Sequence, residues 1–515
     1  MNAADLLLEH GRILTLDPAQ PWAEAVAVRA GRILAVGATA ALRDLAGRGT
    51  RRINCGGGTV LPGFHDPHLH VLGHAGSLLG VDCGPPGVRS LADLQARIRA
   101  AAARTPLGGW IRAWGYHEFF LAEGRHPTRW DLDAAAPHHP VRLLHRTGHA
   151  CVLNSPALRL AGIHLETPEP TGGVIERDLE TGEPNGVLFE MGAYLNARNV
   201  PPPLSPAELE RGVRLANQVY LGHGITTVHD ATAHNGLADW ATFQDLSGRG
   251  LLEPRLTLMV GADQIGDFLE RGMISGWGDD RLRVGAVKLV LDESTGALHP
   301  HPEVLRELVL LAHQTGFQVA IHAIEARHVA AAVEAIAAAQ AAEPRPDPRH
   351  RIEHASVCPP WLVERVREHG LVVVTQPAFI YHHGERYLAQ VPPEDLPWLY
   401  RLRGLVEAGV PLALSSDAPV VPPDPLRTLA AAVTRQTAAG PVVGPQERLT
   451  LEHAVRAATL GAAYADFRED RLGRVVPGYL ADLVVLDRDI TASPALEAAQ
   501  VRLTLLGGRV VWEGA

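Results

Sequence analysis

The sequence predicts an α/β fold: a TIM (β/α)8 barrel with a small β-sandwich built from both chain ends and an inserted αβ subdomain. Three observations predict it. Short apolar runs alternate with helical segments, histidines and one aspartate recur where those runs end, and hairpin patterns occur near the two ends of the chain. The length of 515 residues, of which 46% are hydrophobic, is enough for two or three units with large cores.

Eight apolar runs are candidates for the parallel strands of the barrel. Helical segments such as ARHVAAAVEAIAAAQAA (326–342) follow several of them, as crossover helices do between parallel strands. In this fold, functional residues lie at the carboxyl ends of the strands. The runs are TVLPGFHDPHLH (59–70), GITTVHD (224–230), PRLTLMVG (254–261), RVGAVKLVLD (283–292), FQVAIHA (317–323), RIEHA (351–355), LVVVTQP (371–377) and VPLALSSD (410–417).

Hairpin patterns mark the two ends of the chain. Alternating apolar residues flank a polar-glycine turn in DLLLEHGRILTLD (5–17), in AEAVAVRAGRILAVG (23–37) and again in VRLTLLGGRVVWEG (501–514). Neither end has enough strands for a stable sheet of its own. We therefore expect residues 1–60 and 470–515 to form one composite β-sandwich.

The region between the first two predicted barrel strands is far too long for a loop, at roughly 150 residues. We interpret residues 75–219 as an inserted αβ subdomain over the barrel mouth. The barrel itself then consists of residues 61–74 and 220–469.

Composition narrows the classes of function. The net charge of −10 argues against a nucleic-acid partner, which would favour a basic surface. The first residues lack a basic and a long apolar region, and no apolar stretch reaches membrane-spanning length, so neither a signal peptide nor a membrane partner is expected. Four scattered cysteines form neither a disulfide framework nor a Cys-x-x-Cys site. We expect a cytoplasmic protein that acts on a small molecule, with a homodimer left open.

Two histidines one residue apart end the first apolar run, in GFHDPHLH (63–70). On a strand, residues i and i+2 point to the same side, so His68 and His70 would present two imidazoles to one point. Two buried imidazoles need a partner for their lone pairs, and a divalent metal ion is such a partner. A pair of hydrogen-bonded structural histidines is the alternative.

The chain has 47 lysines and arginines in total. Lys288 is the single lysine, and the others are all arginines. Lys288 lies in the apolar run RVGAVKLVLD, where a charged ammonium would be strongly penalised. An amine can lose its proton and react, whereas a guanidinium cannot. Addition of carbon dioxide would give an anionic carbamate with two oxygens to bridge two metal ions. A Schiff-base lysine, a buried ion pair and chance are the alternatives.

Three more apolar runs end in residues that bind metals. FQVAIHA delivers His322, RIEHA delivers His354, and VPLALSSD delivers Asp417. Because the carboxyl ends of barrel strands meet on one face, we expect these residues to converge with the histidine pair and Lys288. The six together predict a metal site.

This pattern resembles the amidohydrolase superfamily, with His-x-His on the first strand, lysine on the fourth, histidine on the fifth and sixth, and aspartate on the eighth. Further segments are similar to the branch that contains N-substituted formamide deformylases and related N-acyl hydrolases (amidohydrolase family 3). The resemblance implies an enzyme, a hydrolase acting on carbon–nitrogen bonds other than peptide bonds. The further segments are HRTGHACVLNSPALRLAGI (145–163), DPLRTLAAAVTR (424–435) and PGYLADLVVLD (477–487).

The resemblance also implies two divalent metal ions, commonly zinc (Zn2+), bridged by a carboxylated lysine and a hydroxide. Asp417 would take the proton of the hydroxide and pass it to the leaving nitrogen of an amide, formamide, carbamate or cyclic amide. The expected ligands are His68, His70 and Asp417 for one ion, His322 and His354 for the other, and Lys288, as the carbamate, for both.

Three positions depart from the pattern of that family. DES (292–294) stands where Asp-Gly-Ser is expected, Glu325 stands where glycine is usual after His-Ala-Ile, and SSD (415–417) replaces the commoner Gly-Ser-Asp. None of them removes a ligand, and we expect the first two to alter the substrate pocket.

Several other polar residues are candidates for lining the substrate pocket, with an ordinary surface or packing role as the alternative for each. His229, at the end of the second predicted strand, would contact the substrate oxyanion or hydrogen-bond to a ligand. The candidates are Tyr116, His117, Glu118, His149, Glu190, His229 and Glu325.

Two other functions stay open. Glu325 lies three residues beyond His322 and resembles the acid of a mononuclear aminohydrolase (a deaminase), although that branch does not need Lys288. The second alternative is a non-catalytic scaffold with the same fold. Retention of all six ligands argues against it.

Overall fold

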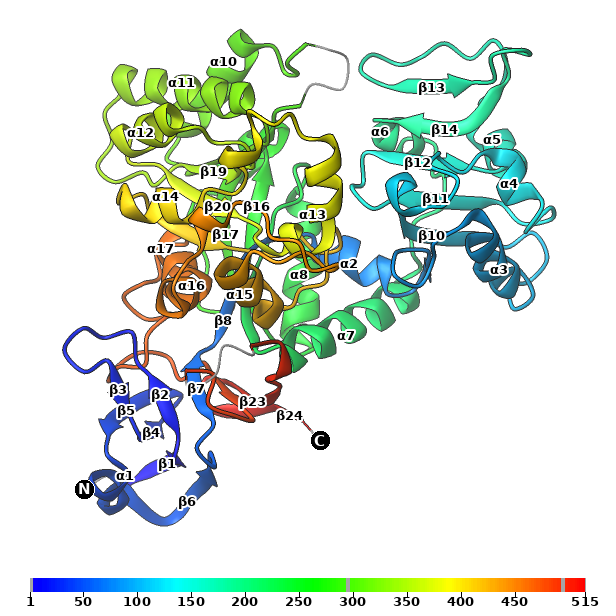
Figure 1. Cartoon of the computed structure of the whole chain (residues 1–515). Coiled ribbons are helices and arrows are strands. Elements are labelled where there is room, and N and C mark those ends of the chain that lie inside the picture. The colour runs from blue at the N-terminus through cyan, green and yellow to red at the C-terminus, as the bar shows by residue number, and fades with distance from the viewer. Residues whose placement is uncertain (1–2, 293–296, 492–495, 515) are drawn as a thin grey trace. The chain divides into compact units, whose positions relative to one another are not determined.

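Eight parallel strands form the largest sheet of the computed structural model, which describes residues 3–292, 297–491 and 496–514 (Figure 1). The segment just beyond the edge strand β21 is joined to the other edge strand, β8, by a backbone hydrogen bond of 2.8 Å from the N–H of Asp417 to the carbonyl of His68. The predicted TIM barrel is therefore confirmed. Its strands are β8 (Phe64–Leu69), β15 (Ile225–Asp230), β16 (Arg255–Gly261), β17 (Leu282–Val290), β18 (Val319–Ala323), β19 (Arg351–His354), β20 (Val372–Thr375) and β21 (Leu412–Leu414).

Helices cover the outside of the barrel, and the alanine-rich α11 shows how. Val329, Val333 and Ile336 recur at helical spacing and are buried, and the helix packs against β18 and β19 (Figure 1). The helices of this unit are α8 (Leu237–Gly248), α9 (Ile265–Leu269), α10 (Pro302–Gln314), α11 (Ala326–Ala342), α12 (Pro360–Glu368), α13 (Ala378–Gln390), α14 (Leu402–Glu407), α15 (Pro425–Thr434), α16 (Leu451–Arg456) and α17 (Ala462–Ala465).

The first predicted strand is in fact two strands. The strand β7 (Thr59–Pro62) belongs to the β-sandwich, β8 belongs to the barrel, and the chain changes sheets at Gly63. A Cβ atom at this position would lie 2.2 Å from Oγ1 of Thr226 on β15, so the close approach requires glycine. The prediction of one continuous strand over 59–70 is wrong because an apolar run does not reveal a change of sheet.

The β-sandwich consists of a sheet in the order β5-β4-β1-β6 and a sheet in the order β24-β23-β22-β7-β2-β3, which combines both chain ends. Leu8, Val60 and Val485 belong to one buried cluster that both ends share. The remaining strands are β1 (Ala4–Glu9), β2 (Arg12–Leu14), β3 (Trp22–Ala23), β4 (Ala25–Arg29), β5 (Arg32–Gly37), β6 (Ala46–Asn54), β22 (Leu483–Leu486), β23 (Val501–Leu506) and β24 (Arg509–Glu513), with the short helix α1 (Thr39–Leu42).

Two of the three predicted hairpins are present, β4–β5 and β23–β24. The first, over 5–17, is wrong. The strands β1 and β2 enter different sheets, because the chain turns at His10 (φ 55°) and then runs beside β7. Alternation around a glycine therefore predicts the two strands correctly but not their pairing.

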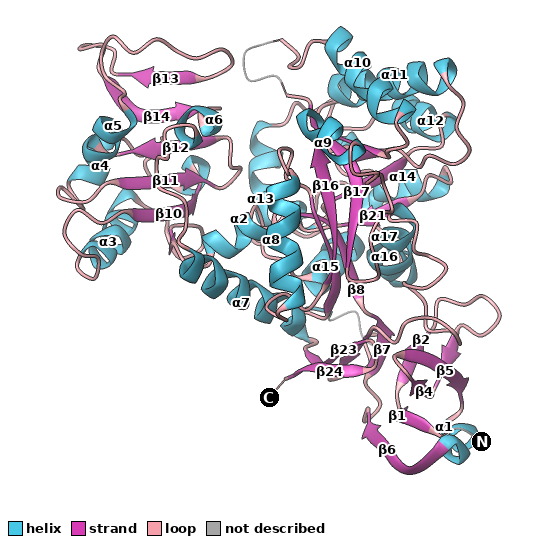
Figure 2. Cartoon of the chain, turned by 180° about the vertical axis from the view of Figure 1, so that it is seen from behind, coloured by secondary structure: helices cyan, strands magenta, loops and turns pink. Residues whose placement is uncertain are grey.

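The inserted unit, Val71–Ala216, contains one six-stranded mixed sheet in the order β13-β14-β12-β11-β10-β9 (Figure 2). The strands β9, β10 and β11 are parallel, and β12 to β14 run antiparallel to their neighbours. The elements are β9 (Val81–Asp82), β10 (Ile111–Tyr116), β11 (Val141–His145), β12 (Ala150–Leu153), β13 (Val174–Arg177), β14 (Pro184–Phe189), α2 (Val71–Ser77), α3 (Leu91–Ala102), α4 (Arg129–Asp133), α5 (Ser155–Ala161) and α6 (Gly192–Asn196), followed by α7 (Pro206–Gly222), which leads into the barrel unit.

None of the described helices combines the length and the apolar character needed to cross a lipid bilayer. The four cysteines are all buried free thiols.

Candidate metal centre

Three of the predicted ligands lie together at the carboxyl ends of β8 and β21. The carboxylate oxygen Oδ1 of Asp417 is 3.4 Å from Nε2 of His70 and 3.6 Å from Nε2 of His68. The ligand atoms of all three residues lie within 4.8 Å of one another, close enough to hold one metal ion. The His68 side chain is buried, whereas that of His70 is 32% exposed, so the group is open on one side.

The other three predicted ligands adjoin this group. Nζ of Lys288 lies 3.4 Å from Nε2 of His68. The rings of His68 and His354 have their centroids 4.9 Å apart, and those of His322 and His354 are 4.4 Å apart. The structure thus brings the six side chains from five strand ends into one continuous group.

The donor set fits a metal ion. Nδ1 of His354 lies 2.8 Å from the amide oxygen of Gln376, which can only accept, so the neutral ring carries its proton on Nδ1. Nε2 then has a lone pair, and it is buried with no hydrogen-bond partner among the described residues. Gln376 is itself fixed by Ser415, whose Oγ accepts a hydrogen bond of 2.8 Å from its amide nitrogen. A buried lone pair held in this way is typical of a metal-binding histidine.

His68 is fixed by a carboxylate in the same manner. Its Nδ1 forms a short hydrogen bond to the buried Glu353, and Glu353 accepts further bonds from Nε (2.7 Å) and Nη2 (3.0 Å) of Arg351. Burial alone would raise the pKa of Glu353, but the charge of Arg351 and the hydrogen bond with His68 hold that pKa well below its usual value. Burial and the neighbouring Lys288 lower the pKa of His68 to about 3, so its Nε2 is unprotonated near neutral pH.

Two of these residues have an unusual backbone conformation. His354 has φ 72° and Asp417 has φ 61°, both in the left-handed region that non-glycine residues rarely adopt. Consecutive residues of a regular strand point to opposite faces, yet Glu353 and His354 both reach His68. The turn of the backbone at His354 makes this convergence feasible, and such conformations cluster at functional sites.

Charges within the group are uneven. Burial lowers the pKa of Lys288 to about 8, despite the nearby carboxylates of Glu353 and Asp417. Burial alone would raise the pKa of Asp417, but the hydrogen bond to His70 and the neighbouring His68 bring that pKa below its usual value. The group therefore offers an amine that can exist uncharged and a carboxylate that is ionised.

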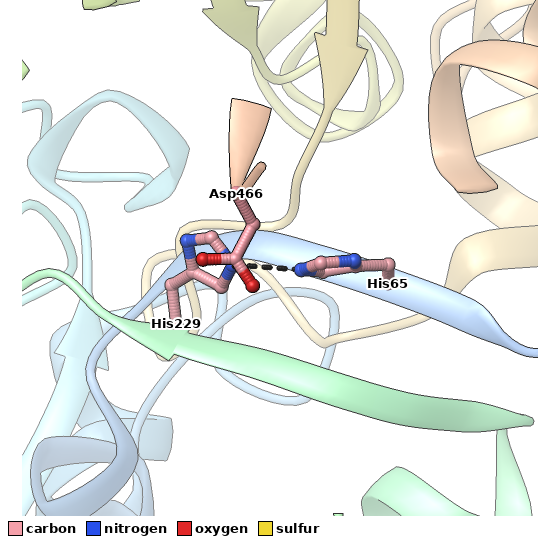
Figure 3. Close-up of side chains that lie close together, drawn as sticks. All are labelled: His65, His229 and Asp466. Carbon is pink, nitrogen blue, oxygen red and sulfur yellow. Dashed lines mark hydrogen bonds and ion pairs between the residues drawn. The ribbon is translucent and has the colours of Figure 1, made fainter. Parts of the chain in front are cut away.

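A second group of two histidines and one aspartate lies nearer the amino-terminal end of β8, and Figure 3 shows its side chains pointing toward one another. The Nε2 atoms of His65 and His229 are 2.7 Å apart, and Oδ2 of Asp466 is 3.4 Å from Nε2 of His229. All three residues are buried, and Oγ1 of Thr257 donates to Asp466 (3.0 Å).

Hydrogen-bond donors argue against a metal ion in this second group. Nη1 of Arg351 donates to Nδ1 of His229 (3.2 Å), so the neutral ring keeps its proton on Nε2, the atom that faces His65 and Asp466. A separation of 2.7 Å is a hydrogen-bond length, shorter than the ~3.3 Å between neighbouring ligands of a tetrahedral zinc ion. The group is a hydrogen-bonded cluster, and through Arg351 and Glu353 it connects to His68.

The remaining predicted residues fall into three places. His229 belongs to the second group. Glu325 caps the N-terminus of α11, where its backbone N–H donates to Nδ1 of His328 (3.3 Å). Within DES (292–294), the second and third residues lie outside the described ranges. The five others are in the inserted unit: Tyr116, His117 and Glu118 follow one another at the end of β10, and His149 contacts Glu190 at 2.8 Å.

Sequence reasoning missed the residues that hold the ligands. Arg351 and Glu353 alternate in the buried strand β19, and two charged residues in an otherwise apolar run were a usable signal for polar contacts inside the barrel. Gln376, just beyond β20, carried a weaker signal of the same kind. Asp466 follows α17 and carried no signal, because its partners are far away in the chain.

Comparisons with known proteins show which family this chain is similar to. A family model described as "Amidohydrolase family" matches residues 51–512. The N-substituted formamide deformylase of Arthrobacter pascens is 30% identical to this chain, over 99% of this chain and 98% of that protein. The protein LONG AFTER FAR-RED 3 of Arabidopsis thaliana is also 30% identical, over 99% of this chain and 92% of that protein.

Among solved structures, a metal-dependent hydrolase from Pyrococcus furiosus superposes with a TM-score of 0.73 and 27% identity. The match covers 94% of this chain and 99% of that one. An adenosine deaminase from Xanthomonas campestris with bound zinc has a TM-score of 0.55 and 17% identity, which supports the shared fold alone.

Proposed function

The chain belongs to the amidohydrolase family, and from that premise we propose that it hydrolyses the carbon–nitrogen bond of a small N-acyl compound with Asp417 as the proton shuttle. It is a metal-dependent hydrolase of carbon–nitrogen bonds other than peptide bonds. The observation that carries the proposal is the convergence of the six strand-end side chains, in which Nε2 of His354 is a buried lone pair without a partner in the described part of the chain.

Two divalent ions, in our proposal zinc, would be held by this group. When bound, such ions lower the pKa of water and polarise a carbonyl group. Lys288, carboxylated by carbon dioxide, would supply two anionic oxygens between the ions. Its burial and its pKa of about 8 leave part of the amine uncharged near neutral pH, and only the uncharged amine adds carbon dioxide. The remaining ligands would be His68, His70 and Asp417 on one side and His322 and His354 on the other.

Asp417 has the position and the charge for proton transfer. Its carboxylate lies between His68 and His70 and is ionised, so it can accept the proton of the attacking water. It then gives that proton to the nitrogen that leaves, which prevents expulsion of an unstable amide anion. The left-handed backbone at Asp417 fixes the direction of the carboxylate.

The class of substrate follows from the relatives. The formamide deformylase of Arthrobacter pascens matches along almost the whole chain, which supports N-substituted formamides and other N-acyl amines before carbamates or cyclic amides. The deaminase alternative has less support, because Glu325 caps a helix and the likeness to a deaminase is limited to the fold.

A conservative replacement tests the proton shuttle. We expect Asp417→Asn to keep the fold and to lower kcat by roughly 10²-fold or more on whichever N-acyl compound the wild type cleaves best. Substrates would be screened with zinc-loaded enzyme by release of the free amine. Asp245→Asn is the matched control, because this exposed aspartate on α8 pairs with Arg249, four residues further along the chain. A kcat close to that of the wild type in Asp417→Asn would contradict the role.

A further inference from the structure

We propose that the inserted unit contains a zinc-binding site of its own, formed by His117, Glu118 and His145. The strands β10 and β11 are parallel, and Tyr116 at the end of β10 lies opposite His145 at the end of β11. His117 and Glu118 follow directly after β10. The three side chains therefore meet at the carboxyl end of two parallel strands, the edge where α/β sheets place their ligands.

The distances between these side chains suit a shared ion. The carboxylate oxygen Oε2 of Glu118 is 3.4 Å from Nδ1 of His117 and 3.0 Å from Nε2 of His145, the latter a hydrogen bond that a shared ion would replace. Neighbouring ligands of a tetrahedral zinc ion with bonds of about 2.0 to 2.1 Å are roughly 3.3 Å apart. Two imidazole nitrogens and one carboxylate oxygen also form a ligand set that zinc uses in proteins.

The protonation of His117 favours a cation over a simple hydrogen-bonded cluster. The backbone N–H of Phe119 donates to Nδ1 of His117 (3.2 Å), so this nitrogen presents a lone pair. A doubly protonated ring would instead direct an N–H at the N–H of Phe119. Nδ1 and the carboxylate oxygen of Glu118 are therefore two acceptors facing each other at 3.4 Å. A bound cation would turn this repulsion into two bonds, at the loss of the weak bond from Phe119.

His145 can offer the lone pair of Nε2 to an ion when its proton moves from Nε2 to Nδ1. Nδ1 of His145 lies 2.8 Å from the hydroxyl of Thr147 and 3.3 Å from the backbone N–H of the same residue. The N–H donates to Nδ1 when the proton is on Nε2, which then donates to Glu118 at 3.0 Å; with the proton on Nδ1, the hydroxyl accepts it and the bond from the N–H is lost. With the proton on Nδ1, Nε2 is a lone pair directed at Glu118, which is how a metal-binding histidine is held.

The surroundings of Glu118 distinguish this group from the cluster of His65, His229 and Asp466. Among the described residues, the ion pairs of Glu118 involve histidines alone, the third being His126 at 3.8 Å. In the other cluster, by contrast, Arg351 donates to His229. The Glu118 side chain is 29% exposed, so an ion has access and a fourth position is open to water.

Zinc stoichiometry tests the site without any need for a substrate. Full-length wild type, Glu118→Gln and His145→Ala would be dialysed against buffered Zn2+ and their retained zinc counted by elemental analysis. We expect each variant to retain one ion per chain fewer than the wild type. His164→Ala is the matched control, because its exposed histidine contacts Glu166 at 3.2 Å in the same unit; it should retain the wild-type number.

Two outcomes would overturn the proposal. One is equal zinc content in the wild type and in Glu118→Gln, a variant of nearly the same shape that is expected to fold. The other is the lack of an anomalous scattering peak beside Glu118 in crystals grown with saturating Zn2+. Both outcomes leave the proposed metal site of the barrel untested, because every variant keeps the barrel ligands and the comparison is between total zinc contents.

Discussion

Strand β8 contributes to two groups that contain the same residue types, two histidines and one aspartate. At its carboxyl end His68 and His70 meet Asp417, and near its amino end His65 meets His229 and Asp466. The position of Arg351 distinguishes the two groups. Beside His68, Arg351 donates to Glu353, and the carboxylate of Glu353 holds Nδ1 of His68; in the second group, Arg351 donates directly to His229. Residue types alone therefore do not define a metal site; the protons on their ligand atoms do.

The two groups also differ in backbone and exposure. Asp417 and the adjoining His354 are in the left-handed region, and His70 is partly exposed. His65, His229 and Asp466 are not among the residues with positive φ, and all three are buried. Backbone strain and access to solvent thus accompany the group that we assign to chemistry.

The largest effect is expected at Lys288. Lys288→Arg should abolish activity and the bound metal pair, because a guanidinium cannot form a carbamate and adds a fixed positive charge beside His68. Lys288→Ala should lose the pair as well, but short carboxylic acids in solution should restore part of it. Metal content by elemental analysis, with and without added acetate or propionate, measures both. A full complement of metal in Lys288→Arg would contradict the bridging role.

Removing a charge from the second group should affect stability and leave the metal content unchanged. Asp466→Asn leaves the buried Arg468 with less compensation, so we expect the free energy of unfolding to fall by about 3 kcal/mol or more. Urea denaturation provides the measurement, and zinc content serves as the control. If folded Asp466→Asn loses zinc, the second group contributes to metal binding, and the assignment of a purely structural role to it is wrong.

Replacement of Glu353, which connects His68 to Arg351, is expected to have an intermediate effect. Glu353→Gln removes the carboxylate that fixes Nδ1 of His68, so the affinity for metal should fall by roughly 10- to 100-fold. Competition with a zinc chelator measures this. Glu364→Gln on the exposed face of α12, also bound to an arginine, is the matched control. Unchanged metal affinity in Glu353→Gln would limit this residue to a role in packing.

The smallest effect is a difference in pH dependence. Burial, and then the neighbouring His229, lower the pKa of His65 well below 6.5, so the folded protein keeps His65 neutral where the unfolded chain binds a proton. Stability contributed in this way is present above about pH 6.5 and is lost as the pH falls. His65→Gln should reduce the slope of unfolding free energy by about 1.4 kcal/mol per pH unit between about pH 5.5 and 4.5. His164→Gln, at the surface, should leave the slope unchanged, and an unchanged slope in His65→Gln would contradict the assignment.

The barrel could be predicted because its evidence is local. Each strand is a short apolar run, and each expected ligand, from His68 to Asp417, stands at or near the end of such a run. The left-handed backbone at His354 could not be predicted, since nothing in its residue type requires it. Pairing across sheets was equally hidden, as the change of sheet at Gly63 shows, because alternation reports which face a residue occupies and not which strand lies beside it.

The candidate sites show the same limit. Residues that follow one another, such as His117 and Glu118, were recognised together, but their partner His145 was not, because it comes from the next strand of the sheet. Contacts between segments far apart, such as His229 with Asp466, have no signature in a single sequence.

The sheet that joins the two ends of the chain has a consequence for synthesis. Thr59, at the start of β7, hydrogen-bonds to Asp489, a residue 430 positions later. During translation, β7 and β2 therefore emerge long before β22, β23 and β24, and one edge of β7 stays unpaired until the barrel has been made. Until then, the unpaired edge of β7 is exposed to other nascent chains. Pairing of β22 with β7 completes this sheet.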